Sequence, residues 1–117
     1  MAHEFSHKLS VQVEEIATGA VVRVRGSADM NEAATLRHRL EELTTKKCRW
    51  IILDLSAMDF ISSEGLAGII LAHIRCRHVG GEVRIVSPQP RVLDVLVHTR
   101  LVMLFPPYAS VQQAMPS

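Results

Sequence analysis

The sequence predicts an α/β fold: a mixed, mostly parallel sheet of four to five strands with helices packed against it. Short β-branched segments alternate with segments of helical periodicity, which is typical of parallel strands joined by crossover helices. Residues 50–55 form an apolar run that does not alternate, as expected of a strand covered on both faces. With 117 residues, 48% of them hydrophobic, the chain can bury one core, so we expect a single domain over residues 1–117 with residues 1–7 flexible.

The first two strands are predicted to form an antiparallel hairpin. Apolar and polar residues alternate over residues 9–13, a period of two that indicates a half-buried strand. Thr18 and Gly19 supply a turn, and a β-branched second strand follows over residues 21–24 and ends at Gly26. Strands joined by so short a connection pair antiparallel, which makes the sheet mixed.

A helix is predicted next, followed by the buried strand. Apolar residues recur at intervals of three and four, as on one face of a helix: Ala33, Leu36, Leu40 and Leu43. Asp29 and Asn31 are candidate N-caps for this helix. Asp54 lies near the carboxyl end of the strand, where open α/β sheets place functional groups. A role in tying down the loop backbone is the interpretation that we favour for it.

Residues 56–61 are expected to form a loop with two apolar residues, Met58 and Phe60, which either form a partner-binding patch or anchor the loop on the core. A second helix is predicted to follow this loop and to end at a pair of glycines. Gly65 and Gly68, near its start, predict close backbone packing there, since glycine otherwise costs helix stability. The remaining elements are, in order, a strand over residues 83–86, a helix over residues 92–97, a short strand near residues 104–105 and a terminal helix capped by Ser110.

Charge and motif content argue against several classes of protein. The 13 Lys and Arg residues nearly balance the 12 Asp and Glu residues, so a nucleic-acid partner is not expected. Neither the cysteines nor the histidines have metal-ligand spacing, so we expect no metal or other cofactor. We recognise no acid–base, nucleophilic or phosphate-binding motif and therefore expect no enzymatic activity. The polar N-terminal segment and the short apolar runs predict a cytoplasmic protein without membrane association.

Ser62 and Ser63 stand where the predicted loop meets the second helix. Their hydroxyls lie beside the exposed N–H groups of the first helical turn, so one can cap the helix while the other faces solvent. A phosphate added there brings about two negative charges to the positive end of the helix dipole. Such a change in surface charge can switch the binding of a partner reversibly. Because Ser is also a favoured N-cap, a purely structural role stays open.

A family resemblance appears at these residues. The run LDLSAMDFISSEGL over residues 53–66 resembles the signature of STAS domains, the anti-sigma factor antagonist family. Gly26 matches that family's glycine after the second strand, and residues 108–110 are similar to its final strand-to-helix run. Residues 99–101 stand where the family usually has threonine–glycine–leucine, with Arg100 in place of the glycine. The resemblance covers nearly the whole chain and implies a mixed sheet with helices packed against it.

The resemblance also implies a role in partner switching, a form of signalling that regulates transcription. In that scheme the unphosphorylated antagonist binds an anti-sigma factor that is also a serine kinase. The kinase phosphorylates and releases the antagonist, and a phosphatase reverses the modification. By position, Ser63 matches the phosphorylated serine, with Ser62 as second choice. The partner-binding residues expected from this resemblance are Met58, Asp59, Phe60, Ser62, Ser63 and Glu64.

Within the run over residues 53–66, two residues depart from the family pattern. Ser62 replaces the usual aspartate, and Glu64 replaces the usual second serine. Glu64 favours the start of the helix, but its fixed negative charge opposes the entry of a phosphate. Two alternatives therefore stay open. One is an interaction or scaffold subunit of the STAS family that is not phosphorylated, and the other is a STAS protein that binds a small ligand or is associated with lipid transport.

Overall fold

The computed structural model describes residues 8–116, so the expectation for residues 1–7 lies outside the described residues. Its four-stranded sheet has the order β1-β2-β3-β4, with β1 antiparallel to β2 and the other two pairs parallel. The predicted mixed, mostly parallel sheet is thus confirmed, as are the predicted helices. In chain order the elements are β1 (Ser10–Ile16), β2 (Gly19–Ala28), α1 (Ala33–Thr45), β3 (Trp50–Ile61), α2 (Ser63–His78), β4 (Glu82–Val86), α3 (Pro90–His98), the 3-10 helix η2 (Leu101–Met103) and α4 (Val111–Ala114).

The hairpin of β1 and β2 is confirmed, and β2 is longer than predicted. Every residue of β1 has a partner on β2, beginning with Ser10 opposite Arg25. Instead of ending at Gly26, β2 continues to Ala28, and Gly26 adopts a φ of 101° within the strand. Glycine reaches this left-handed region without a steric cost, so the strand continues through the glycine.

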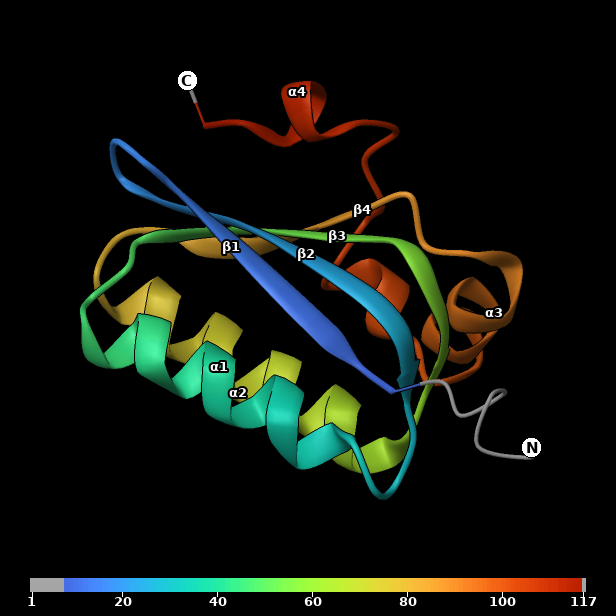
Figure 1. Ribbon diagram of the computed structural model, residues 1–117. Coiled ribbons are helices and arrows are strands. Elements are labelled where there is room, and N and C mark those ends of the chain that lie inside the picture. The colour runs from blue at the N-terminus through green and yellow to red at the C-terminus, as the bar shows by residue number, and fades with distance from the viewer. Residues whose placement is uncertain (1–7, 117) are drawn as a thin grey trace.

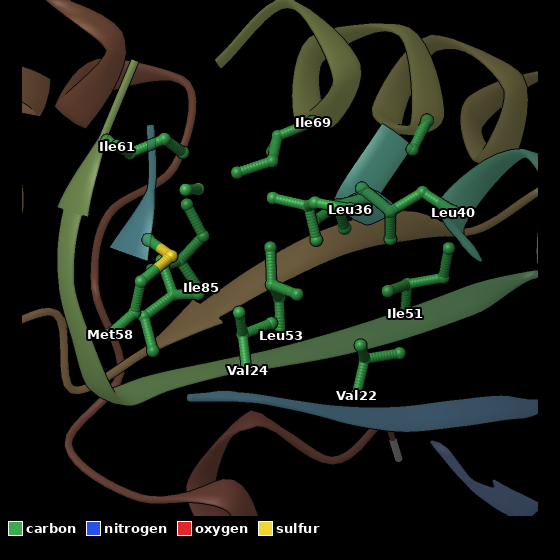
Figure 2. Close-up of a cluster of buried hydrophobic side chains, with 14 of the residues drawn as sticks. Val22, Val24, Leu36, Leu40, Ile51, Leu53, Met58, Ile61, Ile69 and Ile85 are labelled. Carbon is green, nitrogen blue, oxygen red and sulfur yellow. The ribbon is translucent and has the colours of Figure 1, made fainter. Parts of the chain in front are cut away.

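Two cores lie on opposite faces of the sheet. Helices α1 and α2 cover one face, and the C-terminal segment with α4 crosses the other (Figure 1). Val21 and Ile52 on the strands pack with Val86 and Ala114 in the smaller core beneath α4. Because successive residues over 20–22 of β2 and 51–53 of β3 face alternate buried sides, these two stretches are apolar without alternation. The larger core, between the sheet and the two long helices, includes Val22, Val24, Leu36, Leu40, Ile51, Leu53 and Ile69 (Figure 2).

The prediction of a loop over residues 56–61 is wrong, because β3 continues through this stretch and stays paired with β2. The register shifts between Arg23 and Arg25 and again between Gly26 and Ser27. Extra residues on β3 are thus taken up as bulges, which bend a strand without ending it. Figure 1 shows the far half of β3 curving toward the start of α2. Strand pairing uses backbone atoms, so the polar side chains here do not interrupt it.

The predicted strand near residues 104–105 is also wrong. The chain forms η2 over Leu101–Met103, residues 104–105 follow it without strand structure, and the buried ring of Phe105 packs edge-on against His73, with 5.0 Å between the ring centroids. The Phe105 side chain packs against α2, and the backbone of residues 104–105 does not pair with the sheet. Beyond the four strands, the described chain adds one isolated bridge, between Tyr108 and Val86.

Arg100 joins α3 to η2 in a left-handed conformation, with a φ of 64°. This is the position where the family that the sequence resembles usually has glycine. A non-glycine residue pays about 1–2 kcal/mol for this conformation. The chain therefore keeps the tight turn even though the residue best suited to it is absent.

The two serines at the start of α2 lie in different environments. Ser62 is the N-cap: its Oγ accepts a hydrogen bond from the amide of Gly65 at 3.2 Å, and the residue is only 9% exposed. The Ser62 amide donates to the carbonyl of Ala28 at 2.8 Å, which ties the helix start to the end of β2. Ser63 is the first helical residue and is exposed. The cap predicted from the sequence is thus Ser62.

His73 is a buried titratable residue in the larger core. Its Nδ1 accepts a hydrogen bond from the amide of Val83 at 3.2 Å, which joins α2 to β4. Burial lowers the pKa of the imidazole, Glu82 opposes this shift, and Arg77 reinforces it. The neutral ring is therefore the form that the native fold holds.

Removing the cap should cost more stability than removing the neighbouring hydroxyl. We expect Ser62→Ala to lower the free energy of unfolding by about 1 kcal/mol, because the amide of Gly65 loses its acceptor. Ser63→Ala leaves the cap in place and should change it by less than about 0.5 kcal/mol. Urea denaturation of both variants measures the difference. Equal losses would contradict the assignment of Ser62 as the cap.

The stability of the protein should fall in mild acid because of His73. In the unfolded chain an imidazole takes up its proton near pH 6.5, whereas the lowered native pKa delays that uptake. The unfolded state then binds more protons, so the free energy of unfolding falls as the pH drops through 6.5 toward the native pKa. Urea denaturation at a series of pH values should show that the free energy of unfolding falls less in His73→Gln than in the wild type. The same series on His38→Gln, at an exposed histidine, is the control, and identical slopes for all three proteins would refute the assignment.

Candidate functional site

Strands β2 and β3 end together beside the first turn of α2. Their last register pair is Ala28 opposite Ile61. Beyond it, β2 continues into the loop before α1, whereas β3 is separated from α2 by Ser62 alone. The carboxyl ends of neighbouring parallel strands thus bring together segments that are distant in the sequence, the usual place for a functional site in such sheets.

Two glycines let α2 approach its neighbours closely, as the sequence predicted. A Cβ atom on Gly65 would lie 2.8 Å from Cγ1 of Ile61 and 3.6 Å from Cβ of Ala28. A Cβ atom on Gly68 would lie 3.3 Å from Cβ of Arg37 on α1. Gly65 therefore brings the helix start against the two strand ends, and Gly68 brings α1 against α2.

The loop between β2 and α1 is shaped by Asp29. Its Oδ1 accepts hydrogen bonds from the amides of Asn31 at 2.9 Å and Glu32 at 3.0 Å. The N-cap position belongs to Glu32, whose side chain makes no capping bond, so the prediction of Asp29 or Asn31 as N-cap is wrong. Asp29 instead binds the backbone of the turn, a conformation that aspartate favours. The turn leaves Met30 83% exposed.

An open hollow lies between this loop and the start of α2, and we call it the Met30 hollow. The loop and the first turn of α2 face each other at one end of the molecule (Figure 1). Sequence reasoning missed the three loop residues of this site. One signal could have identified Met30. It is a large apolar residue among turn-forming residues, and it does not fit the spacing of residues that face the core. The hollow is lined by Asp29, Met30, Asn31, Phe60, Ser62, Ser63 and Glu64, which include four of the six predicted partner-binding residues.

The other two predicted residues lie elsewhere. Met58 is fully buried in the larger core, where Figure 2 shows its side chain close to that of Ile85. Asp59 is half-buried and is the extra residue of the bulge between Met58 and Phe60. Neither lines the Met30 hollow. Met58 is thus an internal anchor in this conformation, one of the two roles that the sequence left open.

Charged side chains lie beside the hollow. Arg37 Nη1 and Glu64 Oε2 form an ion pair at 3.2 Å, and both side chains are partly exposed. The guanidinium of Arg91 on α3 lies over the ring of Phe60, 5.7 Å from its centroid, at a distance typical of a cation–π contact. The site thus combines a hydroxyl, apolar side chains and a charge pair, a mixture typical of protein–protein interfaces.

Residues 8–116 also bear on metal binding and membrane insertion. Within this range, no group of three or more His, Cys, Asp and Glu side chains is arranged to hold a metal ion. No helix in the same range has both the length and the apolar character needed to cross a membrane.

Comparison with known proteins identifies the family. An anti-sigma F factor antagonist from Paenibacillus polymyxa is 26% identical over 101 residues, which is 86% of each chain. The crystal structure of an anti-sigma factor antagonist from Mycobacterium paratuberculosis superposes with a TM-score of 0.82 at 25% identity, covering 92% of this chain and 91% of that one. The phosphorylated form of the Bacillus cell fate determinant SpoIIAA has the same fold, with a TM-score of 0.69 at 17% identity over 88% of this chain and 95% of that one. The profile of the STAS domain matches residues 10–114, and the chain therefore belongs to the STAS domain family.

Proposed function

We propose that this chain is a one-domain anti-sigma factor antagonist that acts in the cytoplasm and is switched by reversible phosphorylation of Ser63. The observation that carries the proposal is the placement of Ser63: an exposed residue in the first turn of α2, on the wall of the Met30 hollow. The names of the relatives support it, because two of them are anti-sigma factor antagonists. The fold neighbour SpoIIAA has solved structures in unphosphorylated and phosphorylated forms, which supports phosphorylation as the switch.

The modification converts a neutral hydroxyl into an anion. Ser63 Oγ attacks the γ-phosphorus of ATP held by the kinase, the bond to the β-phosphate oxygen breaks, and ADP leaves. The hydroxyl proton passes to a base of the kinase. The phosphate then carries about two negative charges beside the positive end of the α2 dipole, so the helix can hold it without unfolding. A phosphatase restores the hydroxyl by transferring the phosphoryl group to water.

The switch acts through the partner interface. In the unmodified form, Met30 and Phe60 offer apolar surface to an anti-sigma factor in the same hollow that Ser63 lines. Ser62 and Glu64 line this hollow too, and the nearby Asp59 belongs to the same proposed interface. A phosphate within this surface must lose water when the partner docks, and this cost is not repaid by apolar contacts. Phosphorylation therefore releases the partner, which we take to be an anti-sigma factor that is itself a serine kinase.

One observation favours a second candidate function. Glu64 places a negative charge directly after Ser63, and this charge opposes the entry of a phosphate. In that alternative the same hollow binds its partner permanently, as in a STAS interaction subunit that is not phosphorylated. The two functions share the interface and differ in the chemistry of Ser63.

Phosphorylation should occur at Ser63 and not at Ser62. We expect a serine kinase that binds this chain as an anti-sigma factor, together with ATP, to modify the wild type and Ser62→Ala but not Ser63→Ala. The reason is that Ser62 Oγ is committed to the buried cap whereas Ser63 is exposed. Mass spectrometry of tryptic peptides locates the phosphate. Modification of Ser62, or of neither serine, would rule out the proposed switch.

Partner binding should depend on the exposed methionine of the hollow. We expect Met30→Asp to weaken the affinity for the anti-sigma factor by about tenfold or more, since a charge replaces an apolar contact near the centre of the interface. Met103→Asp is the matched control, because Met103 is 80% exposed on η2 and does not line the hollow. Calorimetric titration measures the affinities of both variants.

Equal affinities of Ser63→Ala and Ser63→Asp for the anti-sigma factor would favour the second candidate function over the first.

A further inference from the structure

Arg37 of α1 lies along α2 because of a glycine. A Cβ atom on Gly68 would lie 3.3 Å from Cβ of Arg37 and 3.4 Å from its Cα and Cγ atoms. The stem of the arginine therefore passes directly over the α2 backbone. Its guanidinium reaches back toward the helix start, where Nη1 lies 3.2 Å from Oε2 of Glu64, one helical turn before Gly68.

This ion pair adjoins the proposed phosphorylation site. Glu64 follows Ser63 in the first turn of α2, so an unpaired Glu64 carboxylate would repel a phosphate there. Asp29, which also lines the hollow, adds negative charge. The guanidinium of Arg91 is directed at the ring of Phe60. Arg37 is thus the cation that the structure places on the carboxylate next to Ser63.

We propose that Arg37 is the counter-charge that allows Ser63 to carry a phosphate beside Glu64. The inference rests on the proposed function, because it concerns the same serine and the same transfer of a phosphoryl group from ATP. A guanidinium has five N–H donors, so it can pair with Glu64 and still offer donors to phosphate oxygens. Arg37 thereby offsets the charge of Glu64, one of the residues at which this chain departs from the family pattern.

Two substitutions separate a role of the charge from a role of the packed stem. Arg37→Met keeps an unbranched stem over Gly68 and removes the charge, whereas Arg37→Lys keeps both. The matched control is Arg39→Met, since Arg39 pairs with Glu42 within α1 at 3.4 Å and is likewise partly exposed. All variants carry phosphoserine in place of Ser63, incorporated during translation, so that no kinase is needed.

The measurement is the second pKa of this phosphoserine, followed by ³¹P NMR titration. A nearby cation favours the dianion, so Arg37→Met should raise this pKa by about half a unit relative to the protein with Arg37. Arg37→Lys and Arg39→Met should stay within about 0.2 units of that protein, because each keeps a cation at position 37. In about 1 M salt, where the screening length is about 3 Å, the effect of Arg37→Met should largely vanish.

Three outcomes would overturn the proposal: no shift in Arg37→Met, equal shifts in Arg37→Met and Arg37→Lys, or a shift as large in Arg39→Met. The first shows that Arg37 does not act on the phosphate, the second that a positive charge at position 37 does not account for the effect, and the third points to overall charge. The proposed function fails by a different result. If the kinase leaves wild-type Ser63 unmodified while the pKa shift is present, the switch is refuted and the charge pairing stands.

Discussion

The parallel pairing of β2 with β3 reaches well beyond the apolar run of β3, and the rest of the site depends on this extension. The pairing ends with Ala28 opposite Ile61, and the amide of Ser62 then donates to the carbonyl of Ala28. The first turn of α2 therefore starts from a point that the sheet defines. The bulges on β3 bend its far half toward the helices, so the β2–α1 loop and the start of α2 come to face one another. An earlier end to the pairing would leave the two walls of the Met30 hollow on independent loops.

The two glycines of α2 shape the site because they have no side chain. Gly65 lets the helix start pack on Ile61, and Gly68 lets α1 approach until Arg37 lies over the α2 backbone. The ion pair between Arg37 and Glu64 follows from this close approach. A partly exposed pair of this kind contributes less than about 1 kcal/mol to stability. Its proposed effect is instead local, because the pair lies at the first turn of α2, where Ser63 is exposed.

Local patterns in the sequence predict the hairpin, the helices and the cap at Ser62, because periodicity and capping chemistry act within a few residues. They fail where partners are distant. The stretch after Leu55 looks like a loop because its polar residues break the apolar run, yet its backbone pairs with β2. For the same reason Met58 is expected among the partner-binding residues but is buried. Met30 was missed because its exposure follows from the turn around it and from no periodic pattern.

The hydrogen bonds of Asp29 have a consequence for the thermodynamics of docking. Its carboxylate binds the amides of Asn31 and Glu32, the two residues that follow Met30 in the turn. A loop that must order itself on binding loses conformational entropy, and this loss subtracts from affinity. Here the backbone loses that freedom when the protein folds, before any partner arrives. The methionine side chain keeps its rotamers, so the surface combines a rigid support with an adaptable tip, and docking requires little rearrangement of the main chain.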